Sequence, residues 1–136
     1  MDLRGYGGLL WQGTQLTILV GLFAMLIATV LGLIGAWGKL SKAKISRGVA
    51  DTYTTVIRGV PELVLILLVY YGMPTLIQDL SGAMGIEIII DLNPFAAGVL
   101  TIGFIYGAFS TEVFRGAYLA VPKGQIEAAR SVGMSP

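Results

Sequence analysis

No acidic or basic side chain occurs in the 34 residues from Gly5 to Gly38. Within this stretch, residues 16–37 form an apolar run of 22 residues, and about 20 helical residues are enough to cross the hydrocarbon of a bilayer. Twelve of the 22 are Leu, Ile, Val or Phe, each of which favours insertion by roughly 0.3–0.6 kcal/mol near the helix centre. The run is too long for the apolar region of a signal peptide. The charges of Asp2 and Arg4 also cancel, so the positively charged segment that precedes such a region is lacking. The sequence therefore predicts a membrane span at about residues 14–38.

Two further apolar runs predict two more spans. Leu63–Gln78 has no acid or base, but its 16 residues reach only about 24 Å as a helix. We expect it to extend toward Glu62 and Arg58, which places the second span at about 58–77. Leu92–Thr111 offers 20 such residues and predicts a third span at about 93–114.

The overall composition agrees with a membrane protein. Of the 136 residues 55% are hydrophobic and 12% charged, against about 25% charged in a typical soluble domain. We predict an all-α membrane protein in which residues 1–136 form a single three-span domain. The segment 86–90 fits either a short strand or an interfacial turn.

The bases predict the orientation of the chain. They gather in the loop 39–48 and again after the third span, whereas the loop between the second and third spans has no Lys or Arg. The positive-inside rule then places the N-terminus outside and the segments 39–48 and 120–136 in the cytoplasm.

Several function classes are disfavoured by composition. The chain has no Cys and no His, which removes disulfides, Cys or His metal sites and His-based triads. A net charge of +1 gives no footprint for nucleic acid. A membrane-embedded hydrolase that uses Glu62, Glu112 and Tyr106 is the enzyme alternative, but it lacks an activated nucleophile. We expect no catalytic residue and no metal site.

Small residues recur at helical spacing in the first and third spans. Such residues let helix backbones approach closely in lipid. Static packing is the simpler interpretation, and an interface that rocks during a transport cycle is the functional one. The residues are Ala24, Ala28, Gly32 and Ala36 in the first span, and Gly103 and Gly107 in the third.

Two pairs of opposite charges flank the apolar runs. Arg58 and Glu62 are four residues apart and Glu112 and Arg115 three apart, so each pair shares a helix face. By the predicted topology both pairs lie near the cytoplasmic ends of their spans. They either anchor the helices at the headgroups or form an inner network that joins spans two and three and acts as a gate.

The segment after the third span predicts a short cytoplasmic helix. Pro122 and Gly124 interrupt the membrane helix, residues 125–132 allow two helical turns, and Gly133 suits the position just after a helix. Its small face at Ala128 and Ala129 suits docking into a groove on another protein, although plain helical surface is the simpler interpretation of these residues alone.

This segment resembles the EAA loop of bacterial ATP-binding-cassette importer permeases. The motif is Gly124-Gln125-Ile126-Glu127-Ala128-Ala129, followed by Gly133. The preceding Glu112–Ala117 and Val121–Lys123, and the run from Arg58 to Val64, are similar to the polar amino-acid branch. Residues 32–41, 53–55 and 103–108 look like the Q-type permease of histidine and lysine/arginine/ornithine importers.

The resemblance implies a transport subunit of the bacterial inner membrane rather than an enzyme. It implies these partners: a second permease subunit, two ATP-binding subunits that carry the ATP and Mg, a periplasmic solute-binding protein, an amino-acid substrate and membrane lipid. This chain itself would hold no cofactor. Residues Gly124, Gln125, Glu127, Ala128, Ala129 and Gly133 would couple it to the ATPase.

The chain departs from the family pattern at its C-terminal end. Permeases of this branch continue past the EAA loop with about two more spans, so the resemblance implies a fragment or a C-terminally truncated product. A truncated chain that docks the ATPase without transporting is the alternative to a working permease.

Overall fold

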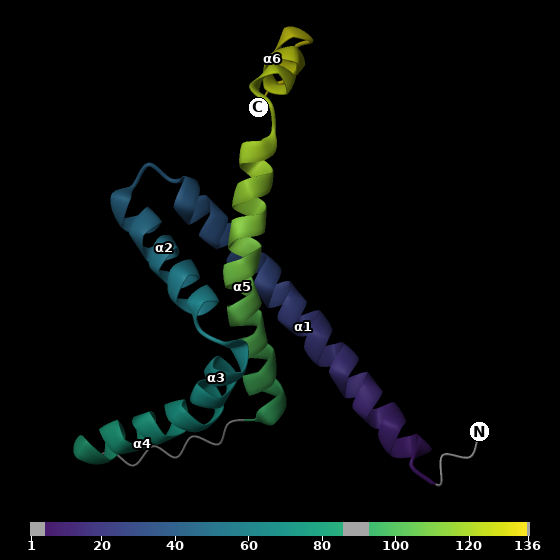
Figure 1. Cartoon of the computed structure of the whole chain (residues 1–136), viewed down its shortest axis with the longest axis vertical. Helices are drawn as coiled ribbons and strands as arrows, with labels where there is room; N and C mark the ends of the chain where they lie inside the picture. The colour runs from purple at the N-terminus through teal and green to yellow at the C-terminus, as the bar shows by residue number, and fades with distance from the viewer. Residues whose placement is uncertain (1–4, 86–92, 136) are drawn as a thin grey trace.

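The computed structural model describes residues 5–85 and 93–135. Within these residues every regular element is helical (Figure 1). The elements are α1 (Gly7–Leu40), α2 (Lys44–Gly59), α3 (Glu62–Leu67), a π-helical turn η1 (Leu68–Gly72), α4 (Met73–Ala83), α5 (Pro94–Ala120) and α6 (Lys123–Ser131). The predicted all-α class is confirmed, and segment 86–90 lies outside the described residues.

Three helical stretches are long and apolar enough to cross a membrane: α1, the stretch Glu62–Ala83, and α5. The spans predicted at 14–38 and 93–114 fall on α1 and α5. With 34 and 27 residues, these helices measure about 51 and 40 Å, which exceeds the roughly 30 Å of hydrocarbon. Both helices can therefore cross the bilayer while tilted.

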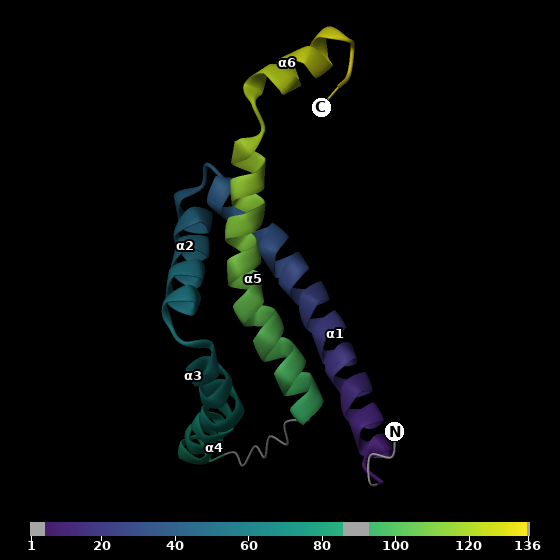
Figure 2. The ribbon, with the colours of Figure 1, turned by 45° about the vertical axis from the view of Figure 1, so that its right-hand side comes forward.

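The core of the molecule is the crossing of α1 and α5 (Figures 1 and 2). A Cβ on Gly103 would lie 2.7 Å from Ile27 Cγ2 and 3.2 Å from the carbonyl oxygen of Ala24. A Cβ on Gly32 would lie 2.5 Å from Ser110 Cβ. The small residues noted in the sequence lie at this crossing, where Ala24, Ala28, Gly32, Ala36, Gly103 and Gly107 are all buried.

The basic segment 39–48 is mostly helical rather than a loop. Only residues 41–43 separate α1 from α2, and α2 then runs from Lys44 to Gly59. Its sequence alternates apolar and polar residues at helical spacing, which makes a strongly amphipathic helix. Its buried residues are Ala50 and Thr54. The helix folds back beside α1 and α5 (Figure 1).

The second span begins later and ends later than predicted. Val60 has an extended backbone and Pro61 precedes the first residue of α3, so α2 and α3 are separate helices. Pro lacks an N–H and therefore favours the start of a helix over its interior. The helix instead gains its length beyond Gln78, reaching Ala83.

A π-helical turn interrupts this second span. Pro74 has no N–H to offer the carbonyl of Tyr70. Just upstream, the Met73 amide bonds to the Leu68 carbonyl, five residues back. The widened turn is the local consequence of the proline.

Candidate functional site

Four charged side chains form a cluster where α1, α2 and α5 meet, which we call the Lys39 cluster. The Lys39 ammonium donates to Glu112 Oε1 and lies 3.1 Å from Asp51 Oδ1. Arg115 donates from Nε and Nη2 to Glu112 Oε2 at 3.1 and 3.0 Å. The side chains of Lys39 and Glu112 are only 11% and 19% exposed, and that of Asp51 is 54% exposed. One ammonium thus joins carboxylates from two other helices.

Close packing of α1 brings these groups together. A Cβ on Gly35 would overlap the buried hydroxyl of Thr111, one residue before Glu112. A Cβ on Gly38 would lie 3.3 Å from the Cβ of Ala50, one residue before Asp51. Because each glycine lets a neighbouring helix approach, Lys39 at the end of α1 reaches both acids.

The structure separates the four charged residues that the sequence grouped into one inner network. Glu112 and Arg115 pair with each other, Glu112 also pairs with Lys39, and Lys39 in turn pairs with Asp51. In the described residues Arg58 and Glu62 form no ion pair, with each other or with that cluster. Arg58 lies over the Phe109 ring at 5.5 Å from its centroid, and Glu62 Oε2 accepts from the Tyr106 hydroxyl at 3.3 Å.

Arg58 and Glu62 lie about halfway along α5 rather than near its α6 end, which the sequence predicts to be cytoplasmic. Tyr106, the partner of Glu62, is 12 residues from Pro94 and 14 from Ala120, or about 18 and 21 Å from the two helix ends. The correction follows from the path of α2. This helix runs beside α5 before the chain reaches the break, so it carries Arg58 and Glu62 toward the middle of α5.

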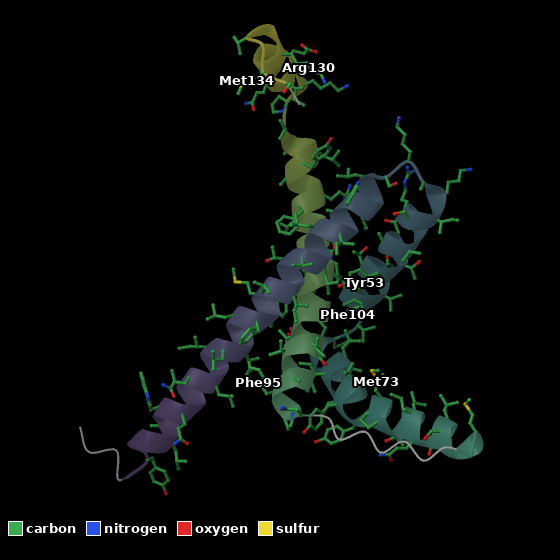
Figure 3. All side chains as sticks on the ribbon, turned by 180° about the vertical axis from the view of Figure 1, so that it is seen from behind. Tyr53, Met73, Phe95, Phe104, Arg130 and Met134 are labelled. Carbon is green, nitrogen blue, oxygen red and sulfur yellow. The ribbon has the colours of Figure 1, made fainter. Side chains whose placement is uncertain are left out.

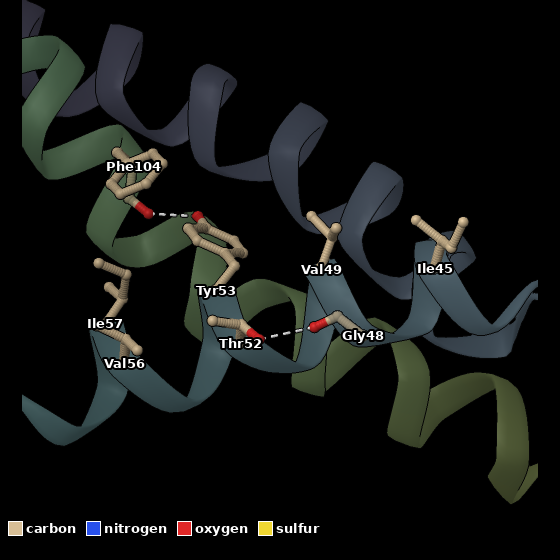
Figure 4. Close-up of a pocket in the computed structure, with 8 residues that line it drawn as sticks. All are labelled: Ile45, Gly48, Val49, Thr52, Tyr53, Val56, Ile57 and Phe104. Atoms are coloured by element: carbon tan, nitrogen blue, oxygen red, sulfur yellow. Dashed lines mark hydrogen bonds between the residues drawn. The ribbon is translucent and has the colours of Figure 1, made fainter.

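Tyr53 is a junction residue, which the sequence places in a family motif without indicating a structural role. Its hydroxyl donates to the carbonyl oxygen of Phe104 at 2.5 Å, and the two ring centroids are 4.9 Å apart. Figure 4 shows the two residues facing each other where α2 passes α5. A Cβ on Gly107 would lie 2.8 Å from both the Tyr53 hydroxyl and Leu31 Cβ, so α1, α2 and α5 meet at this glycine. The role of Lys39 was also missed, because the sequence placed it only among the loop bases and in a family motif.

The outer face of α2 is apolar and open. Ile45, Val49 and Val56 are 83%, 66% and 52% exposed. With Tyr53, Ile57 and Phe104 they line a shallow groove (Figure 4). This face of α2 therefore offers an apolar surface to lipid or to another helix.

The short helix after the third span is formed and stands apart from the bundle. α6 follows a break at Val121 and Pro122, and none of its residues is buried. It lies at the end of α5, on the same side as the α1–α2 turn (Figures 1 and 2). Gly124, Gln125, Glu127, Ala128 and Ala129 are therefore all accessible.

Gly133 ends α6 with a Schellman motif. Its φ is +82°, its amide bonds to the Arg130 carbonyl at 3.1 Å, and the Met134 amide bonds to the Ala129 carbonyl at 3.1 Å. This left-handed position favours glycine. Figure 3 shows Arg130 and Met134 on this terminal unit.

Comparison with known proteins gives consistent matches. Residues 28–136 match the family described as binding-protein-dependent transport system inner membrane component. The permease HisQ of the histidine/lysine/arginine/ornithine transport system of Escherichia coli is 47% identical over 133 residues, which is 98% of this chain and 58% of HisQ. The nopaline permease NocQ of Agrobacterium fabrum is 44% identical over 97% of this chain and 56% of NocQ. The chain thus spans somewhat over half the length of these curated relatives.

A solved structure shares the fold. The crystal structure of an amino acid ABC transporter with histidines contains a chain that is 33% identical, with a TM-score of 0.65. The similarity covers 93% of this chain and 56% of the solved chain.

Proposed function

Because the chain belongs to the family of binding-protein-dependent transport system inner membrane components, we propose that it is a permease subunit of an ATP-driven amino-acid importer. Its place is the bacterial inner membrane, which the family description and three apolar helical stretches support. The observation that carries the proposal is α6, an exposed helix with the EAA motif, joined by a short break to a long membrane helix.

The partners follow from this assignment. A second permease subunit completes the membrane unit, a periplasmic binding protein delivers the solute, and two cytoplasmic subunits hydrolyse ATP with Mg²⁺. In this scheme the chain itself is no enzyme and holds no cofactor. Its contribution is to convert the closing of the ATPase subunits into movement of membrane helices.

The surface of α6 suits docking into an ATPase cleft. Ala128 and Ala129 present a small face that permits close approach, and Glu127 offers a carboxylate for a base on the ATPase. The Schellman motif at Gly133 ends the helix sharply, so the docking unit is compact. A compact element of this kind can transmit displacement without first having to fold.

The break between α2 and α3 is the proposed place of solute contact. Arg58 and Glu62 present opposite charges at mid-depth, and ionisable groups inside a membrane mark solute and ion paths. An amino acid carries an α-carboxylate and an α-ammonium, which these two groups complement. We propose histidine and other basic amino acids as solutes, supported by the names of relatives such as HisQ.

The experiment is uptake of labelled histidine by cells that lack their own permease and express this chain in its natural full length with its partner subunits. Glu127→Ala should insert normally but lower uptake about tenfold, because the ATPase then moves without engaging α6. ATP hydrolysis by the purified complex should fall less than uptake.

Thr55→Ala, on the exposed face of α2, is the matched control and should transport normally. Normal uptake by Glu127→Ala would contradict the docking role of α6. Absence of uptake with the unaltered chain, in complexes that still contain the ATPase, would favour a non-transporting assembly partner.

A further inference from the structure

In the proposed function the ATPase moves α6, and this movement must be passed on to the packed helices at a defined place. The last buried residue of α5 is Thr111, and Glu112 follows it directly. Beyond this point eight residues of α5 lead to Ala120 and then to α6. The Lys39 cluster therefore stands where the free end of α5 meets the packed body.

α2 and α5 are linked at two places: the Tyr53 hydroxyl donates to the Phe104 carbonyl near the middle of α5, and the Lys39 cluster joins the two helices nearer to α6. α5 is pressed against α1 along the crossing, through glycines that leave no space for a Cβ. α2, in contrast, buries only Ala50 and Thr54. Its polar links to the other helices near the end of α1 are the Asp51–Lys39 ion pair and the contact of Ser46 with the Gly38 carbonyl.

Stability alone does not account for the cluster. Placing charges in a membrane is costly, and a buried ion pair can often be replaced by apolar side chains at no loss of stability. Lys39 is 11% exposed and yet contacts two carboxylates. What an ion pair adds is a defined geometry between helices.

We propose that Lys39 is a positioning residue for transport, which holds Asp51 of α2 and Glu112 of α5 together so that α2 follows α5 when α6 moves. α2 ends beside Arg58, so its displacement moves the break between α2 and α3. The inference rests on the proposed function. It names the residue that links the docking helix α6 to the proposed place of solute contact at the break between α2 and α3.

The test uses the complete transporter in lipid nanodiscs, with the binding protein and this chain in its natural full length. Lys39→Met should lower histidine transported per ATP hydrolysed about tenfold, a size typical of coupling between sites. Lys39→Arg should restore most of it. Lys42→Met removes an equal charge three residues away, at an exposed position without an ion pair in the described residues, and should leave the ratio unchanged.

A distance measurement separates positioning from a simple loss of stability. The sequence has no cysteine of its own. Cysteines introduced at exposed Thr52 on α2 and Val113 on α5 would therefore be the only positions of this sequence that take up a spin label. In the unaltered transporter this distance should stay constant when ATP is added. In Lys39→Met it should change or broaden, because the part of α5 around Glu112 then moves without the part of α2 around Asp51, while the Tyr53–Phe104 contact remains.

Four outcomes decide between the proposal and its alternatives. An unchanged transport-to-ATP ratio in Lys39→Met overturns the proposal, and so does an ATP-dependent Thr52–Val113 distance in the unaltered protein, which would make the cluster a gate that opens. If Lys39→Met does not assemble, Asp51→Asn, at a half-exposed position, replaces it and should show the same lowered ratio; a normal ratio overturns the proposal. Failure of the unaltered complex to transport any amino acid rejects the proposed function instead.

Discussion

The α1–α5 crossing and the stretch Glu62–Ala83 are both apolar and long enough to span a membrane, yet they pack very differently. At the crossing, glycines and alanines are buried and backbones nearly touch. In α3 and η1 no residue is buried, and Ser81 is the buried residue of α4. An apolar cavity of about 620 Å³, lined by residues such as Ile27, Met73 and Phe104, lies between the second span and the crossing.

The difference shows that hydrophobicity places a helix in the membrane but does not choose its neighbour. In lipid, apolar side chains gain little by leaving acyl chains for another helix. Close approach requires small residues at matching positions, and the crossing has them. The second span instead has a proline and a π-turn, and it leaves most of its surface for lipid or for another subunit.

The largest expected effect comes from breaking the crossing. Gly103→Val places side-chain carbon against the Ala24 carbonyl, a backbone atom that cannot turn away. Overpacking of this kind typically costs about 1–3 kcal/mol or more. We expect little folded protein in the membrane and a lower unfolding temperature in detergent.

Gly116→Val is the matched control on the same helix, because a Cβ at Gly116 meets nothing within 4 Å. It should accumulate and unfold as the unaltered protein does. An equal loss of folded protein in both variants would mean that a β-branched residue destabilises α5 at any position. The close packing at the crossing would then not be the cause.

A smaller effect is expected where the packed and open regions join. Glu62→Gln keeps the shape of the side chain but removes the charge that we assign to the solute ammonium. A hydrogen bond to a charged group is worth about 1.5–3 kcal/mol, so the KM for histidine uptake should rise at least about tenfold. Unfolding temperature should stay constant.

Tyr106→Phe removes the hydroxyl that donates to Glu62 but leaves the charge, so it should raise the KM far less. If both variants raise the KM equally, the Tyr106–Glu62 hydrogen bond matters for structure and the solute does not contact the charge.

The smallest effect is expected on the open surface of the second span. Leu80 is 63% exposed, so Leu80→Ala should change the unfolding temperature of the isolated chain negligibly, within the roughly ±0.5 kcal/mol usual for surface positions. Loss of the second permease subunit from the purified complex with this variant would instead identify this surface as a subunit interface.

The cluster at Lys39 illustrates where sequence reasoning reached its limit. Glu112 and Arg115 are three residues apart on one helix, so their pairing is visible as a spacing. Lys39 lies 73 residues from Glu112, and no local pattern relates two positions so far apart. The grouping of Arg58 and Glu62 with them failed because it did not foresee that α2 runs beside α5 before the second span begins at Glu62.

By itself, the sequence determined the features that depend on neighbours along the chain. These are the helical class, the three apolar stretches, the small-residue stripes, the stop at Gly133 and the family motifs. Only the tertiary structure decided that Lys39 joins α2 to α5 and that Arg58 and Glu62 lie near the middle of α5. The physical reason is the path of the chain at Ser41 and again at Val60, where a few backbone angles redirect whole helices, and no periodicity of side chains encodes that direction.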